Sequence, residues 1–451
     1  MRYVIIGNST AAIAAVEGIR RVDAQGAITL VADEAYPTYS RPLISYYLEG
    51  RVAEEDMGYR PPDFYARQGV QVRLGVRAAR VEASSRRVVL EDGDELEYDR
   101  LLIATGSRPL ALPVPGLERP GVFYFNRFDD VRALARVAAP RRKAAVVGAG
   151  LTGVKAAEAL ARVGVHVTLV DLAPYPLSAV LDPAGGEMVR RRLETAGITL
   201  RMGCALEEFV GDSRTAQVFP GEWQDLKEKY RRCLVGQHRL TGVRLQDGSS
   251  LQVDFAVVAA GVVPNVEVAE GTGVEIHRGI LVNERMETSV EGIYAAGDVA
   301  EGWDLVRKER RVIATLPNAY RQGEIAGVNM AGGNLAFAGG VAMNSVNVCG
   351  LHVASAGLSN AEGPELEVMV AGDPPRWRYR RITLREGRLA GFACIGNVGR
   401  AGILTALIRA EVDVRPFQLR LLDEGFGLAD LPEPVRRKWD WERGERSWAS
   451  R

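Results

Sequence analysis

The sequence predicts an α/β fold that contains two related nucleotide-binding units. Residues 2–33 hold an apolar strand, a glycine turn, a helix and a second apolar strand, and residues 143–171 repeat this order. Each segment has the length of one βαβ unit, about 30 residues. The strand segments are apolar without alternation, which is typical of parallel strands buried on both faces. We therefore expect a duplicated dinucleotide-binding unit within one chain.

The second unit carries the more complete nucleotide-binding motif. Gly148, Gly150 and Gly153 form a G-x-G-x-x-G between the first strand and the helix. Such glycines allow a tight turn, close approach of a pyrophosphate and close helix–strand packing. Asp171 ends the next strand, 23 residues after Gly148. A carboxylate there accepts ribose hydroxyls and repels a 2′-phosphate, so this unit is predicted to bind NAD rather than NADP.

The first unit carries a degraded form of the same motif. Gly7, Ser9 and Ala12 occupy the three glycine positions, and all three residues are small enough for close approach of a ligand. Asp33 and Glu34 follow the second strand, just beyond the usual position of the ribose-binding acid. The motif alone leaves open which of the two acids is used.

The composition places the chain among globular proteins. At 451 residues, with 47% hydrophobic and 25% charged residues, it has room for about three domains. The formal net charge is zero, which argues against nucleic acid or an anionic membrane as the partner. No apolar run approaches the roughly 18 residues of a membrane span. The N-terminal apolar run is broken by polar residues and is expected to form a strand and turn, not a signal peptide.

Cysteine and histidine usage predicts no metal site and no disulfide scaffold. The residues are scattered, without a C-x-x-C pair or metal-ligand spacing. A reduced, cytoplasmic protein is therefore expected. The four cysteines and four histidines are Cys204, Cys233, Cys349, Cys394, His166, His238, His277 and His352.

Two further motifs connect the chain to a known family. Ala104, Thr105 and Gly106 follow one apolar strand, and Gly297-Asp298 follows another. In this order around the second glycine motif, they resemble the two-dinucleotide-binding-domain flavoproteins of the pyridine nucleotide–disulfide oxidoreductase superfamily. The resemblance covers nearly the whole chain. Within the superfamily, the pattern is most similar to NADH oxidases, NADH peroxidases, coenzyme A–disulfide reductases, rubredoxin reductases and the flavin module of nitrite reductases.

The resemblance implies the domain organisation. An FAD-binding domain would comprise residues 1–113 and 266–333. An NAD-binding domain, residues 114–265, would be inserted into it. A C-terminal α+β interface domain would comprise residues 334–451. The implied cofactors are FAD and NAD(H).

The resemblance also assigns positions around the cofactors. Asp33 or Glu34 would contact the adenosine ribose, and Asp298 the ribitol side of FAD. The helix after Thr315 and Pro317 would point its N-terminus at the flavin pyrimidine, where a positive helix end stabilises an anionic ring. The implied cofactor-binding residues are Gly7, Ser9, Ala12, Asp33, Glu34, Arg41, Pro42, Ala104, Thr105, Gly106, Gly148, Gly150, Gly153, Asp171, Gly261, Gly297, Asp298, Thr315 and Pro317.

Arg41 departs from the thiol-dependent members of the family. It lies in the segment YPTYSRPLIS, where peroxidases and disulfide reductases of this kind carry a redox cysteine. We predict that Arg41 and Pro42 lie against the isoalloxazine and that Arg41 has a catalytic role. A solvated turn residue is the alternative. Without a cysteine in this loop, disulfide, peroxide and persulfide chemistry are not expected.

Lys155 is a second departure. Much of the family has a glutamate at this position, near the nicotinamide. Lys155 is therefore a candidate catalytic residue, with a surface lysine as the alternative. The surrounding segment, GAGLTGVKAAEAL, is similar to the NADH-linked flavoprotein subunits of anaerobic oxidoreductase complexes of the phenylglyoxylate dehydrogenase type.

The predicted function is hydride transfer between NAD(H) and FAD, with electrons passing to or from a protein partner without a redox cysteine. An iron–sulfur protein, a rubredoxin-like carrier or a catalytic subunit is the expected partner, because the cysteines are too few and scattered for a cluster of the chain's own. An NADH oxidase and a non-catalytic nucleotide-binding subunit are the alternatives. A homo- or hetero-oligomer is compatible with the sequence. Residues 211–236 form an insertion whose basic and aromatic residues suit docking to an acidic carrier or a solvated helix.

Overall fold

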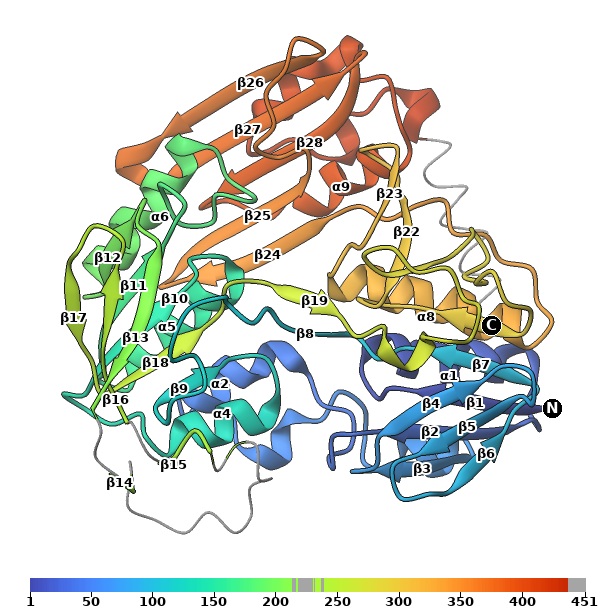
Figure 1. The fold of residues 1–451 in the computed structure, drawn as a ribbon. Coiled ribbons are helices and arrows are strands. Elements are labelled where there is room, and N and C mark those ends of the chain that lie inside the picture. Colours follow the sequence, from blue (N-terminus) through green and yellow to red (C-terminus); the bar gives the residue numbers. More distant parts are fainter. Residues whose placement is uncertain (213–215, 218–229, 231, 237–238, 437–451) are drawn as a thin grey trace. The chain divides into compact units, whose positions relative to one another are not determined.

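The computed structural model describes residues 1–212, 216–217, 230, 232–236 and 239–436. The chain divides into two compact units (Figure 1). The first contains Met1–Pro176 and Leu193–Ala342. The second contains Leu177–Arg192 and the described residues from Met343 onward. The mixed α/β fold is as predicted, while the proposed ranges of the FAD-binding, NAD-binding and interface domains stay predictions.

A parallel sheet forms one centre of the first unit. Its strands are almost continuously apolar and buried, so both faces of the sheet are covered. Parallel pairing brings the carboxyl ends of four strands to one edge, where the motifs of the first nucleotide unit meet. The strand order is β21 (Ile293–Ala295), β7 (Arg100–Ile103), β1 (Arg2–Ile6), β2 (Ala27–Ala32) and β3 (Val70–Leu74).

Two helices pack closely against each other beside this sheet. They are α1 (Thr10–Val22) and α8 (Leu316–Met330). A Cβ added at Gly323 would lie 2.1 Å from the carbonyl oxygen of Ala11, and one at Gly327 would lie 2.2 Å from that of Ala15. The two glycines therefore allow the helix backbones to approach directly, which fixes α8 relative to the first glycine turn.

A second parallel sheet repeats the arrangement. Its helix α5 (Leu151–Arg162) starts at the end of the central strand. Apolar residues of this sheet pack on those of the antiparallel strands at residues 206–211 and 240–245. The predicted duplication is therefore visible as two parallel sheets, each with a glycine turn after its central strand. The strand order is β12 (Thr199–Met202), β11 (His166–Asp171), β10 (Lys143–Val147), β18 (Phe255–Val258) and β9 (Val122–Tyr124).

The first unit also contains short helices and small sheets. The short helices are α2 (Ile44–Leu48), α3 (Phe64–Arg67) and α4 (Phe128–Ala135). Small sheets have the orders β4 (Ala78–Glu82)–β5 (Arg87–Leu90)–β6 (Glu95–Glu97), β13 (Leu206–Gly211)–β16 (Leu240–Leu245)–β17 (Ser250–Gln252), β14 (Ala216–Gln217)–β15 (Val235–Gly236), β19 (Val262–Pro264)–β8 (Ser107–Pro109) and β20 (Ile280–Leu281)–β22 (Ala300–Asp304)–β23 (Glu309–Arg311).

The second unit is built on an antiparallel sheet with helix α9 (Ala401–Arg409) packed against it. Segment Leu177–Arg192, which carries most of α6 (Pro183–Thr195), is tied to this sheet through a buried polar contact. There Asp182 accepts a hydrogen bond from the Tyr379 hydroxyl and lies 3.5 Å from the Arg381 guanidinium. The strand order is β24 (Met343–Val348), β25 (Leu351–Gly357), β28 (Arg388–Ile395), β27 (Arg378–Arg385) and β26 (Leu366–Asp373).

None of the helices described for this chain combines the length and apolar character needed to cross a membrane.

Candidate functional site

A cavity of about 780 Å³ opens at the carboxyl edge of the first parallel sheet. The first glycine turn, the end of β2, the loop before α2 and the Ala-Thr-Gly segment all contribute to its wall. Residues far apart in the sequence are therefore brought together as the family resemblance implies. Of the residues predicted to bind cofactor, those lining the cavity are Gly7, Ser9, Asp33, Glu34, Arg41, Ala104, Thr105, Gly106, Gly297 and Asp298.

The backbone of the cavity floor is built for close approach. Gly7 has φ +128°, and a Cβ there would lie 2.1 Å from the carbonyl oxygen of Ala104. The chain can therefore turn sharply between β1 and α1 only with glycine at this position. The N-terminal end of α1 then faces the cavity at Ser9, in the arrangement that binds phosphate groups.

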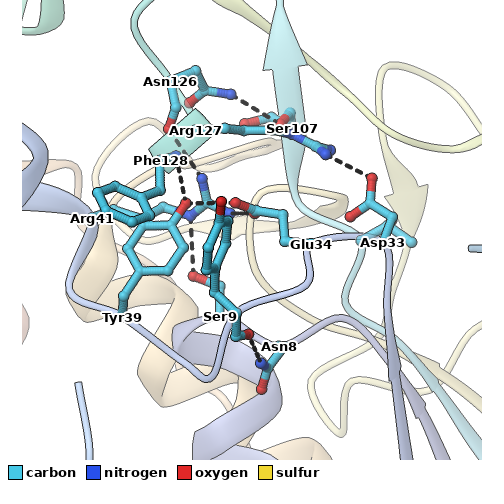
Figure 2. Close-up of polar contacts among 12 residues, drawn as sticks. Asn8, Ser9, Asp33, Glu34, Tyr39, Arg41, Ser107, Asn126, Arg127 and Phe128 are labelled. Carbon is cyan, nitrogen blue, oxygen red and sulfur yellow. Dashed lines mark hydrogen bonds and ion pairs between the residues drawn. The ribbon is translucent and has the colours of Figure 1, made fainter. Parts of the chain in front are cut away.

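The Arg41 side chain lies beside this helix end (Figure 2). Its Nε donates to the Ser9 hydroxyl at 3.3 Å, and one terminal nitrogen donates to the Asn126 carbonyl at 3.1 Å. The other terminal nitrogen pairs with Glu34 at 2.7 Å. Burial acts to lower the pKa of Arg41, but Tyr39 and Glu34 outweigh it and raise the pKa above its ordinary value. The guanidinium is thus a fixed cation next to the helix N-terminus.

The two acids after β2 have different surroundings (Figure 2). Glu34 receives the Tyr39 hydroxyl at 2.7 Å as well as the Arg41 pair, and its side chain is 14% exposed. Asp33 pairs with Arg127 at 2.6 Å, and its side chain is 40% exposed. Glu34 is therefore engaged in holding Arg41, whereas Asp33 contributes the more exposed carboxylate to the cavity lining.

Asp298 also lines the cavity. Burial raises the pKa of its carboxyl, and this exceeds the lowering caused by the Ser107 hydrogen bond and by Arg41. The Ser107 hydroxyl donates to the carboxylate at 2.9 Å. Nearby, Thr105 donates through its hydroxyl to the Asn265 carbonyl at 2.7 Å, which anchors the Ala-Thr-Gly segment. This wall is therefore polar but held in place by neighbouring loops.

The start of α8 provides a further test of fit to a flavin. Thr315 is the N-cap residue of this helix, and Pro317 lies in its first turn. The Thr315 hydroxyl oxygen is buried and has no hydrogen-bond partner among the described residues. Leu316 and Ala319 of the same turn line the cavity, whereas Ala12, Pro42, Thr315 and Pro317 are not part of its lining. A buried hydroxyl and a helix N-terminus at the cavity edge suit a polar ring system that accepts hydrogen bonds.

The second glycine turn forms a separate site. A Cβ at Gly153 would lie 1.8 Å from the carbonyl oxygen of Gly148, whereas Gly150 faces open space. The helix thus packs tightly on the strand while leaving room above the turn for a pyrophosphate. Asp171 accepts hydrogen bonds from the backbone of Ala149 and, at 2.7 Å, of Ala173.

Gly261 lies at the same edge of the second sheet, just after β18. Its φ is +108° and a Cβ there would meet nothing within 4 Å. Because β18 pairs in parallel with β10, Gly261 follows the strand next to the one that leads into Gly148. The position agrees with the predicted nucleotide site, although its role stays a prediction.

Lys155 is not a solvated surface lysine. Its ammonium pairs with Glu158 at 2.7 Å and lies 5.3 Å from the centre of the Tyr46 ring. The side chain is 17% exposed. Helix α5 thus holds the lysine against the helix that follows the Arg41 loop, and its catalytic role stays a prediction.

Some cavity residues were missed by the sequence analysis. Asn126 and Arg127 precede α4, and Tyr230 and Cys233 come from the described end of the insertion at 211–236. Their places depend on contacts across about 90 residues or more, such as Asp33 with Arg127. No local motif marks them. Most of the insertion lies outside the described residues, so its predicted docking role is not tested.

Two of the four thiols are strongly affected by burial. Burial raises the pKa of Cys233 to about 12 and that of Cys394 to about 11. None of the four cysteines is in a disulfide, and Cys233 is the one that lines the cavity. Among the residues described, no three His, Cys, Asp or Glu side chains form a group that could hold a metal ion.

Comparison with known proteins decides the family. Residues 1–323 match the family described as "Pyridine nucleotide-disulphide oxidoreductase". The chain belongs to this family. Residues 343–412 also match the "Rubredoxin NAD+ reductase C-terminal domain". The chain is thus an FAD- and NAD(H)-dependent oxidoreductase, as the glycine motifs and the cavity predict.

Several relatives share most of the chain. Subunit epsilon of the NADH-dependent phenylglyoxylate dehydrogenase of Aromatoleum evansii is 32% identical over 93% of this chain and 94% of its own length. A nitrite reductase of Bacillus subtilis is 30% identical over 92% of this chain, which spans 48% of that protein. The crystal structure of a covalent putidaredoxin reductase–putidaredoxin complex has a similar fold, with a TM-score of 0.82 at 26% identity over 94% of this chain and 96% of that one.

Proposed function

We propose that this protein passes electrons between NADH and a protein electron carrier through FAD, without a thiol intermediate. The observation that carries the proposal is the chemistry of the cavity wall. The loop before α2 places Arg41 in the cavity lining. Cys233 also lines the cavity, and burial raises the pKa of its thiol to about 12. A thiol held protonated is a poor nucleophile and a poor electron relay at neutral pH.

The chain's own residues would hold the two nucleotides. When bound, FAD supplies the two-electron acceptor that takes a hydride from the nicotinamide. The N-terminus of α1 and the Arg41 guanidinium would hold the FAD diphosphate, because a fixed cation beside backbone N–H groups suits phosphate oxygens. Asp33 would accept the adenosine ribose hydroxyls. Contacts of Arg41 with Ser9 favour this diphosphate role over the predicted position against the isoalloxazine.

The acceptor is proposed from the named relatives. Relatives include a rubredoxin–NAD⁺ reductase of Pseudomonas putida, 28% identical over 74% of this chain, and putidaredoxin reductase of the same species, 30% identical over 71%. Both are named for small redox carrier proteins. Together with the rubredoxin reductase C-terminal match, they support a carrier or iron–sulfur subunit as the partner. A cytoplasmic location suits such a partner.

A double-mixing experiment tests the proposal. FAD-loaded protein would be reduced by NADH without oxygen and then mixed with air-saturated buffer, a rubredoxin or a [2Fe–2S] ferredoxin. We expect at least one carrier to re-oxidise the protein on the order of tenfold faster than oxygen, because a docked carrier exchanges electrons at fixed short range. Fast re-oxidation by oxygen and none by either carrier would contradict it.

Direct oxygen reduction is the second candidate. An NADH oxidase of Methanocaldococcus jannaschii is 32% identical over 74% of this chain and 70% of its own length. The same experiment separates the two functions, because an oxidase would be re-oxidised most rapidly by air.

A further inference from the structure

A set of contacts joins helix α2 to helix α5, and none of the residues in it lines the cavity. Three of its residues lie on or just after α2, which follows the Arg41 loop. The other three lie on α5, which begins directly after Gly150 of the second glycine turn. We call this set the α2–α5 cluster. Its members are Tyr46, Glu49, Arg51, Lys155, Glu158 and Arg162.

Ion pairs form most of the cluster. Glu158 pairs with Lys155 at 2.7 Å and with Arg162 at 2.9 Å. Arg162 also lies 3.6 Å from Glu49, which in turn pairs with Arg51 at 3.1 Å. Positive and negative charges thus alternate along the set, and Arg162 of α5 is the cation that both carboxylates share.

The Tyr46 ring closes the cluster. The Lys155 ammonium lies 5.3 Å from the ring centre, and the Arg51 guanidinium carbon lies 4.7 Å from it. Both distances are within the range of cation–π attraction, about 6 Å. The lysine is therefore held by Glu158 on its own helix and by the tyrosine on the other.

Burial separates this cluster from the ordinary surface ion pairs of the chain. The side chains of Glu49 and Glu158 are 1% and 2% exposed. One Glu49 carboxylate oxygen is buried without a hydrogen-bond partner among the described residues. A buried carboxylate is tolerated only while its cations stay in place. Removing a cation partner therefore costs far more free energy here than at the surface. The contacts therefore favour one arrangement of the two helices.

We propose that Glu49 and Glu158 are positioning residues that set the distance and angle between the flavin and the nicotinamide. The inference rests on the proposed function. Helix α5 starts in the second glycine turn, and α2 follows the Arg41 loop, which lines the cavity. Hydride transfer breaks the C4–H bond of the nicotinamide and forms an N5–H bond on the flavin, with both electrons moving in the same step. Its rate depends on a separation near 3–3.5 Å. The cluster itself gives and takes no proton or electron.

Removing either buried charge tests the inference. In FAD-loaded Glu158→Gln and Glu49→Gln, stopped-flow mixing with NADH should show a limiting rate of flavin reduction lowered on the order of 10- to 100-fold. The NADH dissociation constant should change by less than about threefold, because the glycine turn is intact. Glu187→Gln is the matched control, since Glu187 pairs with Arg190 at 2.6 Å on an exposed part of α6. It should leave both quantities unchanged.

A second measurement does not depend on bound cofactor. In the apoprotein, Glu158→Gln should increase amide hydrogen exchange in residues 44–51 on the opposite helix, whereas Glu187→Gln should not. If Glu158→Gln fails to retain FAD, Arg162→Gln gives the same test, because the Arg162 side chain is 47% exposed and its replacement disturbs packing less than that of a buried glutamate.

Two results would overturn the inference. The first is an unchanged limiting rate of flavin reduction in the FAD-loaded variants. The second is slower flavin reduction that is explained entirely by an increased NADH dissociation constant. Failure of the proposed function itself would look different, because NADH would then not reduce the flavin of the unmodified protein.

Discussion

At the residue scale, Arg41 lines the cavity, and its contacts favour another role than the one expected from the sequence. The sequence placed it in the flavin site because it replaces a redox cysteine. Its contacts with Ser9 and Glu34 instead lie at the N-terminal end of α1. Sequence alone could not separate these positions, because both lie within the reach of a long, flexible side chain.

Replacing Arg41 tests the revised role. Arg41→Ala should weaken FAD binding by about 2 kcal/mol, the scale of a charged hydrogen bond, and Arg41→Lys by less. Recovery of FAD fluorescence on release measures the affinity. A normal FAD affinity with a lowered flavin reduction potential would instead support the position against the isoalloxazine.

The thiols give a prediction with a defined pH dependence. Burial raises the pKa of Cys394 to about 11 and that of Cys233 to about 12, so both stay protonated below these values. Iodoacetamide should therefore leave both unmodified at neutral pH, with labelling increasing only as the pH approaches their pKa values. Peptide mass spectrometry measures the labelling, and Cys204, which is partly exposed, is the internal control. Rapid labelling of Cys233 at neutral pH would contradict a mechanism without a redox thiol.

Asp171 carries the prediction of nicotinamide choice. Its carboxylate sits at the end of β11 and would repel a 2′-phosphate by simple Coulomb repulsion. NADH should reduce the flavin on the order of tenfold or more faster than NADPH at equal, subsaturating concentration. Asp171→Asn should lower the ratio of the flavin reduction rate with NADH to that with NADPH, as measured by stopped flow. Equal rates in the unmodified protein would show that Asp171 does not face the ribose.

At the element scale, the contact between α1 and α8 couples the fold to the FAD site. Gly323 allows α8 to approach the backbone of Ala11, which lies in the helix that holds the first glycine turn. The first βαβ pattern predicts α1 and the family resemblance implies α8, but neither predicts their contact, because the glycines of α8 face a helix some 300 residues away. Helical periodicity identifies a buried face and gives no information about its partner.

Gly323→Ala should therefore destabilise the first unit. A methyl group there would lie 2.1 Å from a backbone oxygen. We expect a loss of about 1–3 kcal/mol, the usual cost of overpacking, together with weaker FAD binding. Urea unfolding, monitored by circular dichroism, measures the change in the free energy of unfolding. Gly402→Ala on α9 is the control, because a Cβ there meets nothing within 4 Å. Equal effects of the two changes would show that α1 and α8 do not pack in this way.

At the scale of the whole molecule, the sequence predicted the two parallel sheets more completely than the wall of the site. Motifs such as Gly148–Gly153 are local, because one short segment supplies the turn, the close packing and the helix end. Arg127 and Tyr230 carry no such motif, since their positions follow from how the second nucleotide unit meets the first. The insertion, for which the sequence predicts docking to a carrier or a solvated helix, contributes its described end to the cavity lining, so its deletion would also change the cavity.

The proposed function requires that NADH reduces the FAD of this chain and that no second redox centre takes part. The most direct test is an anaerobic titration of the FAD-loaded protein with NADH, followed by the visible absorbance of the flavin. We predict complete bleaching at about one equivalent of NADH per FAD, because the flavin is the only two-electron acceptor expected on the chain. Absence of bleaching, or bleaching that requires about two equivalents, would contradict the claim.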